Sequence, residues 1–166
     1  MAYNVLMIGI LSDSHDNLIP LRAAVRLFRN AGCDLVIHAG DFVAPFAARE
    51  LGGAGAPVRA VYGNCDGEKA GLAQALEPFG RVHEPPFVFE HAGRTLLVVH
   101  VQAKIQAYAA EKKYDLIVYG HTHKPEVRRV GETILINPGE SGGWVNGRSS
   151  VALFDPDSGD ADIVYL

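Results

Sequence analysis

The N-terminal part of the chain alternates short apolar runs with amphipathic segments, and this order restricts the fold more than any other feature. The run Val5–Leu11 is continuously apolar, which is typical of a strand buried on both faces. Asp34–Ala39 and Val58–Tyr62 are predicted to be strands for the same reason. Because a segment of helical character separates each run from the next, the order β-α-β-α-β predicts a parallel sheet with crossover connections.

The segments between these runs have the spacing of amphipathic helices. In Leu18–Asn30, apolar residues recur every three or four positions, and Gly32 follows as a stop signal. Phe46–Leu51 is predicted to be a short helix that ends at Gly52, and Lys69–Leu76 a further helix. We therefore expect helices to pack against the outside of the parallel sheet.

The second half of the chain is richer in strands. Phe87–His91 and Thr95–Val101 flank a short turn and are predicted to form a hairpin, and Lys104–Lys113 is predicted to be a helix. Further strands are predicted at Leu116–Tyr119, Val127–Val130, Thr133–Ile136, Ser150–Phe154 and Asp162–Tyr165. Two sheets packed together, with helices outside, would accommodate this order. Since no repeat or linker is present, we expect one domain over residues 1–166.

Composition and charge exclude several classes of protein. The chain has 166 residues, 48% of them hydrophobic and 20% charged, which is an ordinary globular balance. A formal charge of −4 without any basic run argues against non-specific nucleic-acid binding, because affinity for a phosphate backbone comes from clustered Lys and Arg. Val5–Leu11 is far shorter than the roughly 20 residues that cross a membrane. With no export signal and no CxxC spacing, we expect Cys33 and Cys65 to be reduced thiols in a cytoplasmic protein without membrane association.

Residues of metal-binding type stand at the end of, or directly after, five of the predicted strands. These residues are Asp13, His15, Asp41, Asn64, Asp66, His100, His121 and His123. In open α/β sheets the carboxyl ends of the strands form one crevice, so these side chains should converge in space. Glycine precedes Asp41, Asn64 and His121, where it allows a sharp turn out of the sheet.

Each of these residues alone has an ordinary structural explanation. Asp41 could cap the helix that follows it, Asn64 could stabilise a turn, and His100 could be a hydrogen-bonded core histidine. The pair His121 and His123 is harder to explain in this way, because two imidazoles around one residue suit metal ligation. The occurrence of such residues at five strand ends favours a metal site.

The same motifs, in this order, resemble those of the calcineurin-like metallophosphoesterase superfamily over nearly the whole chain. The motifs are Asp13-x-His15, Gly40-Asp41, Gly63-Asn64-x-Asp66, His100 and Gly120-His121-x-His123. The short length, the sequence Asn64-Cys65-Asp66 and the later Asn137-Pro138-Gly139 are similar to the small prokaryotic phosphodiesterases of that superfamily. The resemblance implies an α/β fold that is a four-layer α-β-β-α sandwich, with two mixed sheets flanked by helices.

The resemblance also implies two divalent metal ions that share one aspartate. One ion would be bound by Asp13, His15, Asp41 and His123. The other would be bound by Asp41, Asn64, His100 and His121, so that Asp41 bridges the pair. Nitrogen and oxygen donors without thiolate suit Mn, Fe, Co, Ni or Zn, and Mg is a further alternative. Manganese is the ion that we expect.

Such a centre implies a phosphoesterase, and we expect a phosphodiesterase that acts on a small phosphate-ester substrate by in-line attack of a metal-bridging hydroxide. The residues expected to act in catalysis are Asp41, Asn64, Cys65 and Asp66. The alternatives are a phosphomonoesterase, or a non-catalytic scaffold of the same fold similar to the small subunit of retromer. Because similar proteins often associate, we expect a homodimer or homotetramer if the chain is not a monomer.

Two positions depart from the pattern of the family. Many members have histidine where this chain has Cys65, and that histidine assists the leaving group; a thiol is a poorer proton donor to an alkoxide. After His100 the family usually has glycine, whereas Val101 follows here and could narrow the entrance to the site.

The stretch Gly139–Gly143 fits the GxSxG pattern of serine hydrolases, whose catalytic histidine comes later in the chain. No histidine follows His123, so this pattern does not indicate a serine nucleophile. We therefore expect residues 137–143 to lie beside the metal site and lend it backbone amides.

Overall fold

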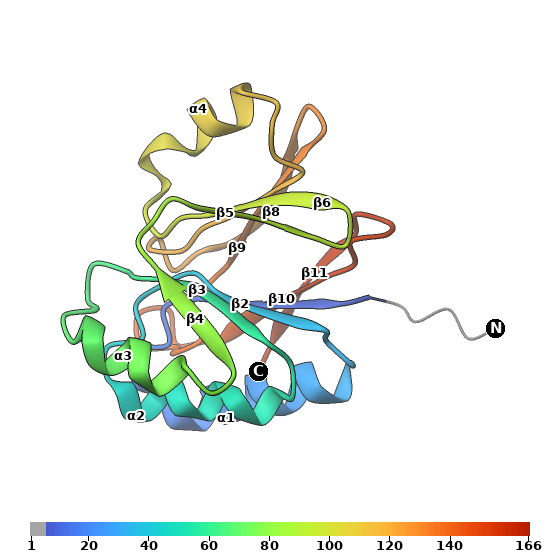
Figure 1. Cartoon of the computed structure of the whole chain (residues 1–166). Coiled ribbons are helices and arrows are strands. Elements are labelled where there is room, and N and C mark those ends of the chain that lie inside the picture. The colour runs from blue at the N-terminus through green and yellow to red at the C-terminus, as the bar shows by residue number, and fades with distance from the viewer. Residues whose placement is uncertain (1–5) are drawn as a thin grey trace.

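Two β-sheets pack face to face, with helices on both outer sides (Figure 1). The computed structural model describes residues 6–166, so Val5, the first residue of the predicted N-terminal strand, lies outside them. Helices α1, α2 and α3 cover one sheet, and α4 covers the other. This arrangement confirms the predicted four-layer α-β-β-α sandwich.

The first sheet has six strands in the order β11-β10-β1-β2-β3-β4. Its strands are β1 (Ile8–Leu11), β2 (Leu35–His38), β3 (Val58–Val61), β4 (Gly80–His83), β10 (Ser150–Phe154) and β11 (Ala161–Tyr165). Strands β1 to β4 are parallel, as predicted for the first three, whereas β10 and β11 run antiparallel to their neighbours. The sheet is therefore mixed, and its parallel part carries the N-terminal motifs.

The second sheet has five strands in the order β5-β6-β7-β9-β8. Its strands are β5 (Phe87–His91), β6 (Arg94–Val98), β7 (Leu116–Val118), β8 (Pro125–Val130) and β9 (Thr133–Pro138). The predicted hairpin is present, with Phe87 opposite Val98 and His91 opposite Arg94. Strands β6, β7 and β9 are parallel to one another. Both sheets therefore contain parallel strands whose carboxyl ends can present side chains together.

The helices match the predicted segments with two differences. The helical segments are α1 (Leu18–Asn30), α2 (Pro45–Ala48), the 3-10 helix η1 (Arg49–Ala54), α3 (Lys69–Leu76), the 3-10 helix η2 (Gln102–Lys104) and α4 (Ile105–Ala110). The segment predicted at 46–51 changes to 3-10 geometry and continues to Ala54, where Gly55 ends it with a φ of 73°. The segment predicted at 104–113 ends early, because Lys112 has a φ of 54°. No helix among residues 6–166 is long and apolar enough to cross a membrane.

Side-chain alternation along the strands separates the core into three layers. Ile8 and Ile10 of β1 face the second sheet, while Leu11 faces the helices on the other side. In β7, Val118 lies between the sheets and Ile117 packs against α4. Because successive side chains of a strand point to opposite faces, strands such as β1, β2, β7 and β9 bury residues on both faces and are fixed in register. The loops after the carboxyl ends are therefore held by a rigid frame.

Candidate metal centre

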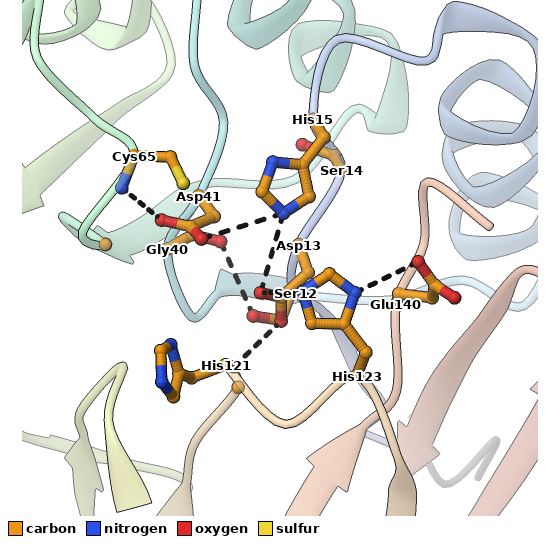
Figure 2. A network of polar contacts seen from close by, with 12 residues as sticks. Ser12, Asp13, Ser14, His15, Gly40, Asp41, Cys65, His121, His123 and Glu140 are labelled. Atoms are coloured by element: carbon orange, nitrogen blue, oxygen red, sulfur yellow. Dashed lines mark hydrogen bonds and ion pairs between the residues drawn. The ribbon is translucent and has the colours of Figure 1, made fainter. Parts of the chain in front are cut away.

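The seven residues predicted to be metal ligands lie together beyond the carboxyl ends of β1, β2, β3, β6 and β7 (Figure 2 shows the part around Asp13 and Asp41). Backbone hydrogen bonds join the loops that carry them. The amide of Asp13 donates to the carbonyl of Gly40 at 2.9 Å, and the amide of Gly120 donates to the carbonyl of His100 at 3.0 Å. Five loops from two sheets thus form one site.

The first group of donors surrounds Asp13. The Nε2 atom of His123 lies 3.4 Å from Oδ1 of Asp13, and Nε2 of His15 lies 3.9 Å from the same oxygen. The His15 Nε2 atom is also 3.6 Å from Oδ2 of Asp41. Two donors about 2.1 Å from a shared ion stand roughly 3 to 3.5 Å apart, so this group is close to the spacing of one coordination sphere.

The second group of donors lies on the other side of Asp41. The Oδ1 atom of Asn64 is 3.0 Å from Nε2 of His100 and 2.8 Å from Nδ1 of His121. The His100 Nε2 atom is 3.4 Å from Oδ2 of Asp41. The Oδ2 atom of Asp41 therefore faces both groups, whereas its Oδ1 atom accepts a hydrogen bond of 2.8 Å from the amide of Cys65.

Two buried polar atoms of the site have no hydrogen-bond partner among the described residues, namely Oδ1 of Asp13 and Nε2 of His15. Buried polar atoms are normally paired, because an unpaired one loses its interaction with water without compensation. Burial raises the pKa of Asp13 above its ordinary value, although a hydrogen bond from Ser12 acts in the other direction. A cation between these two atoms would satisfy both, so the residues present fit a divalent metal ion.

The backbone of the site is held in a conformation that non-glycine residues rarely adopt. Five of the predicted ligands have a positive φ: Asp13 (53°), His15 (41°), Asp41 (60°), His121 (67°) and His123 (59°). Each such residue costs on the order of 1 kcal/mol, less for Asp than for β-branched residues, and persists only where the surroundings fix it. The amide of His121, for example, donates to Oδ2 of Asp13 at 3.0 Å. Strain of this kind clusters at functional sites.

Three glycines give the ligands the space that they need. A Cβ atom at Gly63 would lie 2.1 Å from Oδ1 of Asp41. At Gly40 it would lie 2.7 Å from Nδ1 of His100, and the φ of 101° confirms the sharp turn predicted there. Gly120 has no positive φ; glycine is required there only because the side chains of Ser12 and Asp13 lie close to its Cα.

Asp41 and His100 form an ion pair, with Nε2 of His100 3.4 Å from Oδ2 of Asp41. Burial opposes the charge on Asp41, but hydrogen bonds from His100 and Cys65 lower the pKa of Asp41 below its ordinary value. Burial also acts against a charged His100, but the hydrogen bond and charge of Asp41 raise the pKa of His100 overall. The Nδ1 atom of His100 lies 2.8 Å from the carbonyl of Ala39 and donates to it, which leaves Nε2 directed at Asp41.

A family model described as the calcineurin-like phosphoesterase superfamily domain matches residues 6–159. The chain belongs to this superfamily. Phosphoesterases of the superfamily use divalent metals, in agreement with the donor groups described above.

Two further comparisons give the same family. The phosphodiesterase MJ0936 of Methanocaldococcus jannaschii is 31% identical to this chain, and the match covers 90% of this chain and 93% of the relative. The solved structure of an archaeal phosphodiesterase superposes with a TM-score of 0.92 at 30% identity and covers 97% of this chain and 100% of its own. Vacuolar protein sorting 29 of Cryptosporidium parvum shares the fold at 15% identity, with a TM-score of 0.73 and coverage of 97% and 96%.

Two of the residues predicted to act in catalysis have different surroundings from the others. Asp66 is buried, and its carboxylate accepts hydrogen bonds from the backbone amides of Asp41, Gly63 and Val43 at 2.9, 2.7 and 2.8 Å. These contacts make Asp66 a positioning residue for the two loops, and its predicted catalytic role stays a prediction. Cys65 is exposed beside Asp41, and partial burial of its sulfur together with nearby carboxylates raises the pKa of the thiol to about 11. The catalytic role of Cys65 stays a prediction.

Glu140 is a site residue that no pattern in the sequence indicated. Its Oε2 atom lies 3.0 Å from Nδ1 of His123, and the residue is buried. Burial alone would raise the pKa of Glu140, but hydrogen bonds from the amides of Val145 and Asn146 and from His123 lower it overall. A carboxylate on the second ring nitrogen fixes the tautomer and orientation of a metal-binding histidine. Glu140 lies in a glycine-rich loop, where the sequence pattern does not indicate a contact with His123.

The loop at residues 137–143 lies beside the site as predicted, but its amides bind the chain itself. Ser141 donates to the carbonyl of Ser12 at 2.9 Å, and Gly142 donates to the carbonyl of Asp13 at 3.0 Å. Ser141 is fully buried and its hydroxyl also donates to Ser12, which agrees with the exclusion of a serine nucleophile. The loop thus fixes the position of Asp13.

His38 also bonds residues next to the ligands. Its Nδ1 atom accepts a hydrogen bond of 3.1 Å from the amide of Gly40, so Nε2 carries the proton and donates to the hydroxyl of Ser14 at 3.0 Å. Burial lowers the pKa of His38 to about 3. His38 therefore supports the loops that carry the neighbouring predicted ligands.

Two clefts open at the site. One has a volume of about 340 Å³ and is lined by His15, Asp41, Asn64, Cys65, His121, His123, Trp144 and Val145. The other has a volume of about 440 Å³, begins at Asn64 and His100, and continues past Tyr62, Lys104 and Tyr108. Val101 is 44% exposed and forms part of the wall of this second cleft, next to His100, so the predicted narrowing of the entrance stays a prediction.

Proposed function

We propose that the protein is a phosphodiesterase that uses two divalent metal ions, with manganese as the expected ion. The observation that carries this proposal is the position of Asp41. Its Oδ2 atom lies 3.6 Å from the donor nitrogen of His15 and 3.4 Å from that of His100, between two separate groups of donors. One carboxylate in this position can be shared by two ions, the arrangement found in two-metal hydrolytic sites.

The residues of the chain hold and orient the reactants. When bound, two divalent ions would supply an acidified water as nucleophile and stabilise charge on the phosphoryl oxygens. The amide of Cys65 holds Oδ1 of Asp41 and so directs Oδ2 toward both donor groups. Glu140 orients His123, and the carbonyl of Ala39 orients His100. These contacts hold the donor atoms of His123, His100 and Asp41 in fixed orientations, as electrostatic catalysis requires.

The two clefts support a diester as the substrate. Asn64 lies in both, so a phosphate bound at the metal centre would stand where they meet. A diester has two substituents, and each cleft could accept one of them. A monoester would leave one cleft empty. The name of the 31% identical relative, a phosphodiesterase, supports the same choice.

The test is hydrolysis of bis-p-nitrophenyl phosphate and of p-nitrophenyl phosphate with added manganese. We expect turnover of the diester to exceed turnover of the monoester, and Asp41→Ala to lose diester hydrolysis. Loss of a partner outside the coordination sphere typically costs about 10- to 100-fold, so loss of the shared ligand should cost more than about a hundredfold. Asp41→Asn, which preserves the shape of the side chain, should show the same loss.

The matched control is Asp162→Ala, which removes an exposed carboxylate from β11 and should retain full activity. Diester hydrolysis that survives in Asp41→Asn with metal bound would contradict the proposed mechanism. A wild-type protein that binds metal but hydrolyses neither ester would favour the scaffold alternative.

A further inference from the structure

Two large apolar side chains are exposed at the rim of the metal centre. Trp144 is 65% exposed and Val145 is 69% exposed, and both line the cleft of about 340 Å³ that contains His15 and His123. Aromatic side chains bury a large area when they bind a partner, and their exposure beside polar residues marks a place of contact.

Contacts to the site on two sides hold Trp144 in place. Its Nε1 atom donates to the carbonyl of His15 at 3.0 Å. The amide of the next residue, Val145, donates to the carboxylate of Glu140 at 3.0 Å, and Glu140 in turn bonds Nδ1 of His123. The indole is therefore fixed relative to two predicted metal ligands, and little conformational freedom remains to be lost when it binds a ligand.

The chemistry of the cleft selects the kind of group that it can accept. The indole N–H is already bonded to His15, so Trp144 presents its ring faces and edge. Among the residues that line this cleft there is no Lys or Arg, so a second anionic group would find no cation outside the metal centre. A flat, uncharged ring fits this environment, because ring stacking needs no charged partner.

We propose that Trp144 determines specificity by stacking on an aromatic or nucleobase substituent of the phosphate ester. This inference rests on the proposed function, since it takes the metal centre to be the place where the phosphate binds. The ester's phosphate would sit among the histidines, and its planar substituent would lie on the indole with Val145 beside it. A small alkyl substituent would gain much less from this surface.

The only tryptophan of the chain reports directly on this contact. The zinc-loaded protein is titrated with adenosine 5′-monophosphate or with ribose 5-phosphate, which has the phosphate and sugar but no base. We expect saturable quenching of the tryptophan emission by the nucleotide and no change with ribose 5-phosphate. Equal changes with both ligands, or calorimetric binding of the nucleotide without quenching, would overturn the proposal.

Two variants separate stacking from support of His15. Trp144→Ala removes both the aromatic surface and the N–H, whereas Trp144→Phe keeps a smaller aromatic face and removes the N–H. We expect Trp144→Ala to bind adenosine 5′-monophosphate at least about tenfold more weakly by calorimetry, with ribose 5-phosphate unchanged. Trp144→Phe should remain close to wild type. If both variants weaken both ligands equally, the indole serves only to hold His15 and the proposal fails.

These measurements do not depend on turnover, so the two proposals can fail separately. Quenching by the nucleotide in a protein that hydrolyses no diester would support the stacking role and overturn the proposed activity. If the protein hydrolyses diesters but its Trp144→Ala variant binds the nucleotide like wild type, the proposed activity is supported and the stacking role is overturned.

Discussion

At the scale of single residues, the site tolerates little added volume. A Cβ atom at Gly120 would lie 2.0 Å from the hydroxyl of Ser12 and 2.7 Å from Oδ2 of Asp13, both of which are buried. We expect Gly120→Ala to lower the free energy of unfolding by about 1 to 3 kcal/mol, because overpacking displaces its neighbours. Metal affinity should also fall, since Asp13 is among the neighbours that must move.

Gly67→Ala is the control for this prediction. A Cβ atom there would meet nothing within 4 Å, and Gly67 does not have a positive φ. Urea unfolding and calorimetric titration with manganese measure the two effects. Equal stability and equal metal affinity in Gly120→Ala and Gly67→Ala would show that the strand-end loops are looser than described.

The lowered pKa of His38 predicts how the free energy of unfolding of the metal-free protein depends on pH. The pKa of His38 is about 3 in the folded protein, against 6.5 as its ordinary value, so between these values the unfolded chain binds a proton that the folded chain does not. Stability should therefore fall as the pH is lowered from 6.5, and this residue contributes about 1.4 kcal/mol per pH unit within that window.

The variant His38→Gln cannot take up this proton. It should be less stable than wild type at neutral pH, since it loses the bonds to Ser14 and Gly40, but the difference should narrow as the pH falls. Urea unfolding at a series of pH values below 6.5 gives both curves. Parallel curves would mean that His38 titrates in the folded protein as it does in the unfolded chain.

At the scale of secondary-structure elements, prediction from the sequence succeeded where local patterns decide the structure. Leu18–Asn30 has the predicted bounds, because its apolar spacing and the stop signal at Gly32 agree, and Lys69–Leu76 also has the predicted bounds. The strand β4 was missed, since Gly80–His83 is a short edge strand with little apolar alternation. This strand forms because it pairs with β3, and such a long-range pairing cannot be predicted from the local sequence.

The same division holds for the site. The seven candidate ligands were predicted because each lies at the end of a strand and has a side chain suited to metals, and the structure brings all seven together. Glu140 was missed because its contact with His123 joins two loops that follow different strands. The positioning role of Asp66 was missed for the same reason, since three backbone amides from separate positions define it.

The segment that follows β9 supports the site through Glu140. Glu140→Gln preserves the size of the side chain but replaces one acceptor oxygen with a donor, which cannot pair with the amides of Val145 and Asn146. We expect metal affinity to fall by about 10- to 100-fold, because partners of metal-binding histidines typically contribute that much. Calorimetric titration with manganese measures it, and Glu132→Gln, at an exposed turn, is the control. Unchanged affinity would show that His123 needs no orientation.

At the scale of the whole molecule, the site depends on how the two sheets pack. Strands β1, β2 and β3 belong to one sheet and β6 and β7 to the other, so the ligands meet only in the folded chain. A metal that binds this state alone stabilises it, by about 2.7 kcal/mol when its free concentration is one hundred times its dissociation constant.

Metal removal should therefore lower the temperature of unfolding. We expect a clear decrease when EDTA is added to the manganese-loaded protein, and a much smaller one in Asp41→Asn, whose metal binding is already weakened. Differential scanning calorimetry with and without EDTA checks this. An identical unfolding temperature with and without metal would mean that the ions contribute nothing to holding the two sheets' loops together.

Anomalous X-ray diffraction from crystals grown with manganese tests the central claim most directly. We expect two anomalous peaks, one on each side of Oδ2 of Asp41: the first among Asp13, His15 and His123, the second among Asn64, His100 and His121. A single peak, or peaks that Asp41 does not contact, would contradict it.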